Sequence, residues 1–344
     1  MDLTPALIWA PPDDWHRLTV IESHAGGEPF RVVVEGVVDI PGDTVLDRRR
    51  YAQSNLDHLR KALMWEPRGH ADMYGGFIGP PASPDGDIAV LFVHNEGFST
   101  MCGHGIIALS KVVLETGIMP ASEPETTLRI DTPAGRVVSI SSMRDGLVTA
   151  TRFRNVPSFV VAMDATIEVP GLGEIGYDLA FGGAFYALVE VAAAGLDLDD
   201  AASLIAAGRV IKEAISGSRE FEHPDHSDLE FLYGVIFTGP ALDPAHHSRN
   251  VCVFADGEVD RSPTGTGVSA RLAVMSARGE VAPGQPVVIE SLVGSTFTGR
   301  LAETIDLGGR EAIIPEIEGS AYITGRAEMW LDPDDRLGEG FLVR

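Results

Sequence analysis

The chain has 344 residues, of which 44% are hydrophobic, and a formal net charge of −24. The length predicts a sizeable core and two domains, and the acidic charge argues against nucleic acid or anionic membranes as partners, because both bind basic patches. No signal peptide or membrane span is apparent, and two cysteines argue against a disulfide framework, so a reduced, cytoplasmic protein is expected.

The first part of the chain predicts a strand, a turn and a second strand, followed by a helix. Residues 1–15 are rich in proline and acid and predict a loose arm. We expect a strand from about Leu18, a glycine turn over 23–29, a strand over 30–38 and one amphipathic helix over 46–64 that Pro67 ends. The glycine-rich segment 66–76 is either a solvated loop, which is favoured, or a pocket wall.

A short buried strand over 88–94 leads to the first motif, Ser99-Thr100-Met101-Cys102-Gly103-His104-Gly105. Cys102 lies where a helix running to about Glu115 should begin, and Gly117 should end it. The N–H groups and positive dipole end of such a helix lower the pKa of a thiol and bind a carboxylate. This arrangement suits proton abstraction beside a carboxylate, and the alternative is a small apolar cysteine in a glycine turn.

The second half should begin near Asn155. The first half should end with strands over 127–131, 137–141 and 147–153. After Asn155 we expect strands to about 169 and over 185–191, a helix over 199–216, and strands over 229–238 and 250–255. His223 and His226 lie among acids, but their segment lacks the other ligands of a metal site, so none is expected. Cys252 is interpreted as a buried apolar residue of its strand.

The second motif, Asp260-Arg261-Ser262-Pro263-Thr264-Gly265-Thr266-Gly267, repeats the layout of the first. Gly279 follows Thr264 by 15 residues (279 − 264), as Gly117 follows Cys102 (117 − 102). The repeat predicts a duplicated half-domain with two facing helix starts. We expect one half over 1–154, to which residues 325–344 return, and another over 155–324, the last strands lying over 287–292, 295–305, 312–318 and 320–331.

With the segments 23–31, 66–75 and 294–300, these motifs resemble the proline racemase family nearly from end to end. The resemblance implies the α/β fold of diaminopimelate epimerase, in which two similar halves each wrap a sheet around a central helix and the active site lies in the cleft. Racemases and 4-hydroxyproline epimerases of the family use two cysteines, one on each face of the α-carbon. This chain has Thr264 at the second position, which resembles the trans-3-hydroxy-L-proline dehydratases that form Δ1-pyrroline-2-carboxylate and water.

Dehydration needs one base at the α-carbon, and a threonine hydroxyl does not ionise usefully near pH 7. The leaving hydroxyl and the α-hydrogen lie on the same face of the ring. Cys102 would therefore take the α-proton, and His104 or the new Cys102 thiol would protonate the hydroxyl. Thr264 would pack and hydrogen-bond on the far face.

The resemblance also places the contacts to a hydroxyproline substrate. The N–H groups of Gly103, Gly265 and Thr266 would bind the carboxylate, and Asp260 would accept a hydrogen bond from the ring ammonium. His104 is a further contact of the family, with a structural role as the alternative, and Tyr74 matches an aromatic pocket residue for which simple packing is an equal alternative. The chain has no Walker motif, full dinucleotide fingerprint or recognisable pyridoxal phosphate lysine, so we expect no cofactor.

Two other functions stay open. A racemase or epimerase would need a second thiol, and Cys252 lies 12 residues before Thr264 (264 − 252) on a strand. A non-catalytic protein that binds a proline-like ligand would keep the carboxylate cradle, but a cysteine at a helix start argues against it. The sequence does not determine the oligomeric state, for which a homodimer is a candidate.

Overall fold

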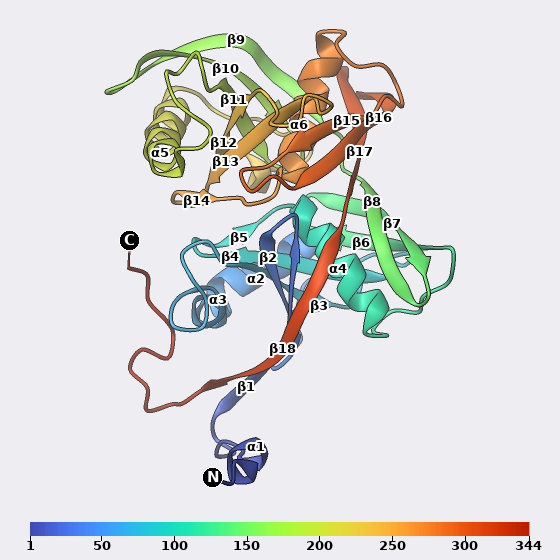
Figure 1. Ribbon diagram of the computed structural model, residues 1–344, viewed down its shortest axis with the longest axis vertical. Coiled ribbons are helices and arrows are strands. Elements are labelled where there is room, and N and C mark those ends of the chain that lie inside the picture. The colour runs from blue at the N-terminus through green and yellow to red at the C-terminus, as the bar shows by residue number, and fades with distance from the viewer. Residues whose placement is uncertain (344) are drawn as a thin grey trace.

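The computed structural model describes residues 1–343, which form six α-helices, one 3-10 helix and eighteen strands in one hydrogen-bonded network. Figure 1 separates the elements into a lower and an upper group, and β18 runs from the upper group into the lower one. We call the lower group, with β18, the N-terminal half, and the upper group the C-terminal half.

The N-terminal half contains the first eight strands and the first four helices. Its elements are α1 (Thr4–Ile8), β1 (His16–Ala25), β2 (Glu28–Glu35), α2 (Val45–Asn55), α3 (Asp57–Met64), β3 (Tyr74–Gly79), β4 (Ile88–His94), β5 (Phe98–Ser99), α4 (Gly103–Glu115), β6 (Glu125–Thr132), β7 (Gly135–Arg144), β8 (Leu147–Arg154) and the last strand, β18 (Ala321–Leu331).

The C-terminal half contains the elements between β8 and β18. They are β9 (Phe159–Val169), β10 (Gly173–Phe181), β11 (Phe185–Glu190), α5 (Ala201–Ser218), η1 (Ser227–Leu229), β12 (Leu232–Gly239), β13 (Ser248–Phe254), β14 (Glu258–Val259), α6 (Gly265–Ala277), β15 (Val287–Glu290), β16 (Thr296–Leu307) and β17 (Arg310–Gly319).

The two halves have the same strand pairing. In the N-terminal half, β1 pairs antiparallel with β2, β2 parallel with β3, β3 antiparallel with β4, and β4 antiparallel with β5 and parallel with β6. In the C-terminal half, β10, β11, β12, β13, β14 and β15 repeat this series of directions. The expected fold of two similar halves is therefore confirmed.

Each half surrounds one apolar helix. α4 is buried along its length except at Lys111 and Glu115, and it packs on β1, β2, β7, β8 and β18. α6 packs in the same way on β9, β10, β11, β16 and β17. A helix that is apolar on all sides is stable only inside a core. Gly117 and Gly279 follow the two helices with φ of +75° and +71°, as expected for C-terminal stops.

The chain passes between the halves twice. Residues 155–158 connect β8 to β9, and Ser320 connects β17 to β18, which pairs with β1 from Ala25–Ala321 to His16–Leu331. Next to these passages, β17 pairs antiparallel with β8. The division into domains at residue 155 and near residue 324 stays a prediction, because strand pairing continues from one half into the other.

Two expectations for the N-terminal half were wrong. The helix expected over 46–64 is two helices, because Leu56 leaves helical geometry (φ −122°, ψ 11°) and buries its side chain at the junction. The segment expected as a loop contains β3, whose glycines allow close packing: a Cβ on Gly75 would lie 2.5 Å from the Arg31 carbonyl oxygen.

The arm over 1–15 contains the short helix α1, and strand β10 was not expected. No helix within residues 1–343 combines the length and the apolar character that crossing a membrane requires.

Candidate active site

The N-termini of α4 and α6 meet where the two halves face each other. A Cβ on Gly103 would lie 2.6 Å from the Gly265 Cα, and a Cβ on Gly265 would lie 2.8 Å from the Gly103 Cα. Only glycine allows this approach at either position. The cavity at this meeting point has a volume of about 10 Å³, and it is lined by Tyr74, Met101, Cys102, Gly103, His104, Tyr186, Tyr233, Phe254, Asp260, Thr264, Gly265 and Thr266.

All eight predicted site residues line this one cavity: Tyr74, Cys102, Gly103, His104, Asp260, Thr264, Gly265 and Thr266. The cavity has room for about one water molecule. This volume is too small for a ring of proline size, so we expect such a ring to enter when the halves move apart. Ion pairs between Arg261 and Asp72 (2.9 Å) and between Arg50 and Asp228 hold the halves together in this closed form.

Cys102 is the N-cap residue of α4. Its Sγ accepts a hydrogen bond from the Gly105 N–H at 3.2 Å and lies 3.2 Å from Nδ1 of His104. Burial nevertheless raises the pKa of the Cys102 thiol well above its ordinary value of 9.0, although the Gly105 N–H and Tyr74 lower it. The lowered thiol pKa expected from the helix start is therefore wrong for the closed protein, since loss of hydration outweighs the helix N–H groups.

His104 is buried beside this thiol. Burial lowers the pKa of its imidazole below 6.5, more than the charge of Asp260 raises it. The ring packs edge to face against Tyr74, with 4.9 Å between ring centroids, and against Phe30 at 6.0 Å. Near neutral pH the site thus holds a neutral thiol beside a neutral imidazole, and the 3.2 Å contact between Sγ and Nδ1 is a path for the thiol proton.

Tyrosine hydroxyl groups form much of the polar wall. Tyr74, the first residue of β3, hydrogen-bonds through its hydroxyl to the Ser99 hydroxyl and, at 3.2 Å, to the Tyr233 hydroxyl. Tyr186 pairs with the Thr266 hydroxyl at 2.7 Å. Tyr74 is 2% exposed and lines the cavity, which makes segment 66–76 a pocket wall where it reaches the site.

Four lining residues were not predicted from the sequence: Met101, Tyr186, Tyr233 and Phe254. One of them had a readable signal. Tyr74-Gly75 begins β3, and Tyr233-Gly234 follows the first residue of β12, the counterpart of β3 in the C-terminal half. The internal repeat thus extends to the pocket tyrosines. Tyr186 and Phe254 had no comparable signal, because their strands read as ordinary buried strands.

Asp260 and Thr264 form a closed turn on the other side of the cavity. Asp260 accepts hydrogen bonds from the Thr264 hydroxyl at 2.8 Å and from the Ser262 N–H at 2.7 Å. A carboxylate has about four acceptor positions, so Asp260 can accept more. Thr264 has φ +64° and ψ 92°, a conformation that costs a β-branched residue free energy.

Cys252 does not line the cavity and is fully buried in β13. Burial, followed by the charge of Asp260, holds the pKa of the Cys252 thiol well above the ordinary value, although hydrogen bonding with the Thr264 side chain lowers it. The cavity therefore has one thiol in its lining, on the side of α4.

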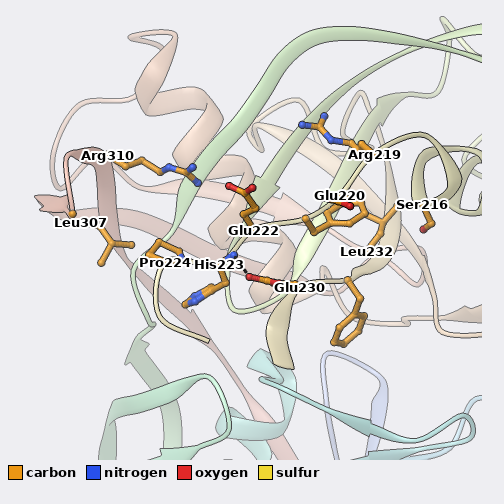
Figure 2. A pocket seen from close by; sticks show the side chains of 13 residues that line it. Ser216, Arg219, Glu220, Glu222, His223, Pro224, Glu230, Leu232, Leu307 and Arg310 are labelled. Carbon is orange, nitrogen blue, oxygen red and sulfur yellow. Dashed lines mark hydrogen bonds between the residues drawn. The ribbon is translucent and has the colours of Figure 1, made fainter. Parts of the chain in front are cut away.

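Another cavity lies in the C-terminal half, away from these residues. It has a volume of about 1010 Å³ and contains none of the predicted site residues (Figure 2). His223 lies there, with its ring 5.9 Å from that of His226. No group of three histidine, cysteine, aspartate or glutamate side chains within residues 1–343 could hold a metal ion.

Known proteins are similar to this chain over nearly its whole length. A family model described as proline racemase matches residues 20–342. The chain is 42% identical over 341 residues to a trans-3-hydroxy-L-proline dehydratase from Colwellia psychrerythraea, covering 98% of this chain and 96% of the relative. It is 44% identical over 329 residues to a 3-hydroxyproline 2-epimerase from Burkholderia multivorans, covering 95% and 98%.

Among solved structures, the chain is similar to a hydroxyproline epimerase from Agrobacterium vitis with bound trans-4-hydroxy-L-proline. The TM-score is 0.91 at 35% sequence identity, and the match covers 96% of both chains. Relatives of comparable similarity thus include both dehydratases and epimerases.

Proposed function

Because the chain belongs to the proline racemase family, we propose that it dehydrates trans-3-hydroxy-L-proline to Δ1-pyrroline-2-carboxylate and water. The observation that carries this proposal is Thr264, which stands opposite Cys102 at the start of α6 and offers a hydroxyl where a two-base enzyme needs an ionisable group. The similarity to proteins named as dehydratases supports it.

The two helix starts provide for binding of the substrate. The N–H groups of Gly103, Gly265 and Thr266 would bind the carboxylate, since free N–H groups and the dipole at a helix start favour an anion. Asp260 would accept a hydrogen bond from the ring ammonium. Closure of the halves over the bound ring would exclude water and strengthen both interactions.

Cys102 and His104 would supply the base and the acid on one face of the ring. The thiol proton passes over 3.2 Å to Nδ1 of His104, and the resulting thiolate takes the α-proton. The electron pair of the C–H bond forms a double bond between the α-carbon and C3, the C3–O bond breaks, and the imidazolium protonates the hydroxyl as it leaves as water.

This step returns His104 to the neutral state and leaves the α-proton on the Cys102 thiol. The cyclic enamine then transfers one N–H proton to C3 and becomes the imine. The base, the acid and the carboxylate cradle all come from the chain, so the reaction needs no cofactor. Both cysteines are free thiols, which fits a reducing, cytoplasmic compartment.

The test is incubation with trans-3-hydroxy-L-proline, followed by borohydride reduction of the imine to proline and mass analysis. Cys102→Ser should lower turnover by about 10²–10⁴-fold, because serine is no base near neutral pH. Its melting temperature should match that of the parent. Formation of the 2-epimer without imine would instead indicate an epimerase, and binding without turnover would indicate a binding protein.

A further inference from the structure

Glu28 is a buried acid to which the proposed reaction assigns no role. It is the first residue of β2, in the motif over 23–31, and its side chain has no exposed surface. Its Oε2 accepts a hydrogen bond of 2.7 Å from the backbone N–H of Arg261, which belongs to the opposite half. Glu28 therefore connects the N-terminal half to the turn that carries Asp260 and Thr264.

That turn has a strained shape that must be held in place. Thr264 has a positive φ, and within the turn its N–H donates to the Ser262 hydroxyl at 3.1 Å. From the N-terminal half, Glu28 holds the backbone of Arg261 and Asp72 holds its guanidinium at 2.9 Å. Both contacts join the two halves in the closed arrangement.

We propose that Glu28 is a positioning residue of the active site, whose carboxyl group fixes the Arg261 backbone on closure and so sets the Asp260–Thr264 turn against Cys102. The inference rests on the proposed function only in taking this cavity as the reacting site. Glu28 does not line the cavity, so it acts through the turn.

The surroundings of Glu28 favour its neutral form. Its Oε1 is buried and has no hydrogen-bond partner within residues 1–343. The titratable groups around it are Asp260 beside the turn, Glu258 on β14, Cys102 at the start of α4, Cys252 on β13 and the Arg261 guanidinium.

Burial, followed by the charge of Asp260, raises the pKa of Glu28 well above its ordinary value of 4.5. In the closed protein Glu28 is thus a neutral acid that accepts one backbone hydrogen bond. Glutamine has the same shape and keeps that acceptor, whereas alanine removes it.

Alkylation of Cys102 by iodoacetamide tests the proposal without reference to the reaction catalysed. Cys102 is 4% exposed in the closed form, so its alkylation reports opening, and the fully buried Cys252 is an internal reference. Glu28→Ala should accelerate alkylation of Cys102 by about tenfold, since a buried N–H loses its acceptor in the closed form only. Glu28→Gln should protect Cys102 at least as well as the parent.

The matched controls are Glu35→Ala and Glu35→Gln, at the exposed end of the same strand, where Glu35 accepts from the Thr19 hydroxyl at 2.9 Å. Both should leave the alkylation rate unchanged. In the catalytic assay, Glu28→Ala should lower kcat/KM and Glu28→Gln should restore it.

Alkylation of Glu28→Ala at the parent rate would overturn the proposal, and so would a Gln variant that behaves like the Ala variant. Equal acceleration at Cys252 would show general loosening of the fold and would also overturn it. Faster alkylation of Cys102 alone, in a protein that forms no imine, would support the role of Glu28 and reject the proposed dehydration.

Discussion

Thr264→Cys should convert the one-thiol site into a two-thiol site. Thr264 and Cys102 occupy equivalent positions at the starts of α6 and α4, and both line the same cavity. In the variant, the Cys102 thiolate would remove the α-proton of L-proline, which has no leaving group at C3. The new thiol would deliver a proton from the other face and give D-proline.

The structure sets the expected magnitudes. The variant weakens the 2.8 Å hydrogen bond from position 264 to Asp260, which lowers the free energy of unfolding by about 1 kcal/mol. It also removes a β-branched side chain from a position with φ +64°, which raises the free energy of unfolding by about the same amount. The melting temperature should therefore stay within about 3 °C of the parent. A positioned acid contributes about 10²–10⁴-fold, so D-proline should form at least about 100-fold above the parent rate.

Burial of the new thiol does not oppose this result. The closed site raises the pKa of Cys102, and we expect the same at position 264, where Asp260 lies within 2.8 Å of the present hydroxyl. A helix start alone would favour a lowered pKa and rapid alkylation of the new thiol, and we expect neither in the closed site. A neutral thiol is the form that donates a proton to the carbanion, and alkylation should be fast only in the open form.

The assay is incubation with L-proline in deuterium oxide, followed by chiral chromatography and mass analysis of the D-proline. Thr264→Ser keeps the hydroxyl and should give no D-proline, and Cys252→Ser in the Thr264→Cys background should leave the gain intact. A correctly folded Thr264→Cys protein without D-proline would refute the assignment of positions 102 and 264 to opposite faces of the substrate.

His104→Gln should change the dependence of kcat/KM on pH. In the parent, the raised pKa of Cys102 and the lowered pKa of His104 keep the number of protons on the pair constant between about pH 6.5 and pH 9.0. The kcat/KM of the parent should therefore be flat over this range. The variant has no internal acceptor for the thiol proton, so kcat/KM should rise about tenfold per pH unit through neutrality, and a flat variant profile would contradict the relay. Asp260→Asn should raise KM by about tenfold or more while the free energy of unfolding falls by about 1 kcal/mol, measured by steady-state kinetics and urea unfolding; an unchanged KM would exclude Asp260 as a substrate contact. Glu28 should make closure depend on pH. A carboxyl whose pKa is raised in the closed form stabilises that form fully below its ordinary pKa of 4.5, and this stabilisation is lost as the pH rises through the raised pKa. The ratio of the Cys102 alkylation rate in the parent to that in Glu28→Gln should therefore rise with pH, and a constant ratio would contradict a neutral Glu28.

The parts of the site that the sequence predicted are local in the chain. Cys102 and Thr264 could be placed at helix starts because the apolar run and the glycine stop of each helix lie within 15 residues. The two motifs then predicted that the helices face each other. Tyr74 could be included only through the family resemblance. Its strand is rich in glycine because it packs closely on β2, and this packing is seen only in the assembled sheet.

The parts that could not be predicted depend on the closed cavity. The direction of the thiol pKa is set by burial, which comes from both halves together and is absent from the motif around Cys102. The contact of Glu28 with Arg261 joins residues 233 positions apart. The break at Leu56 is different, because Ser54, Asn55 and Asp57 beside it are weak helix formers and were a local signal for it.

The return of the last strand has a consequence for synthesis on the ribosome. β1 lies between β2 and β18, yet β18 leaves the ribosome after nearly all of the rest of the described chain. Until then one edge of β1 is unpaired, and an unpaired edge is a template for aggregation. The N-terminal half therefore cannot complete its sheet before the C-terminal half is made, unlike the usual order in which an N-terminal unit folds first. Chains that terminate before Ala321 should aggregate even when every catalytic residue is present.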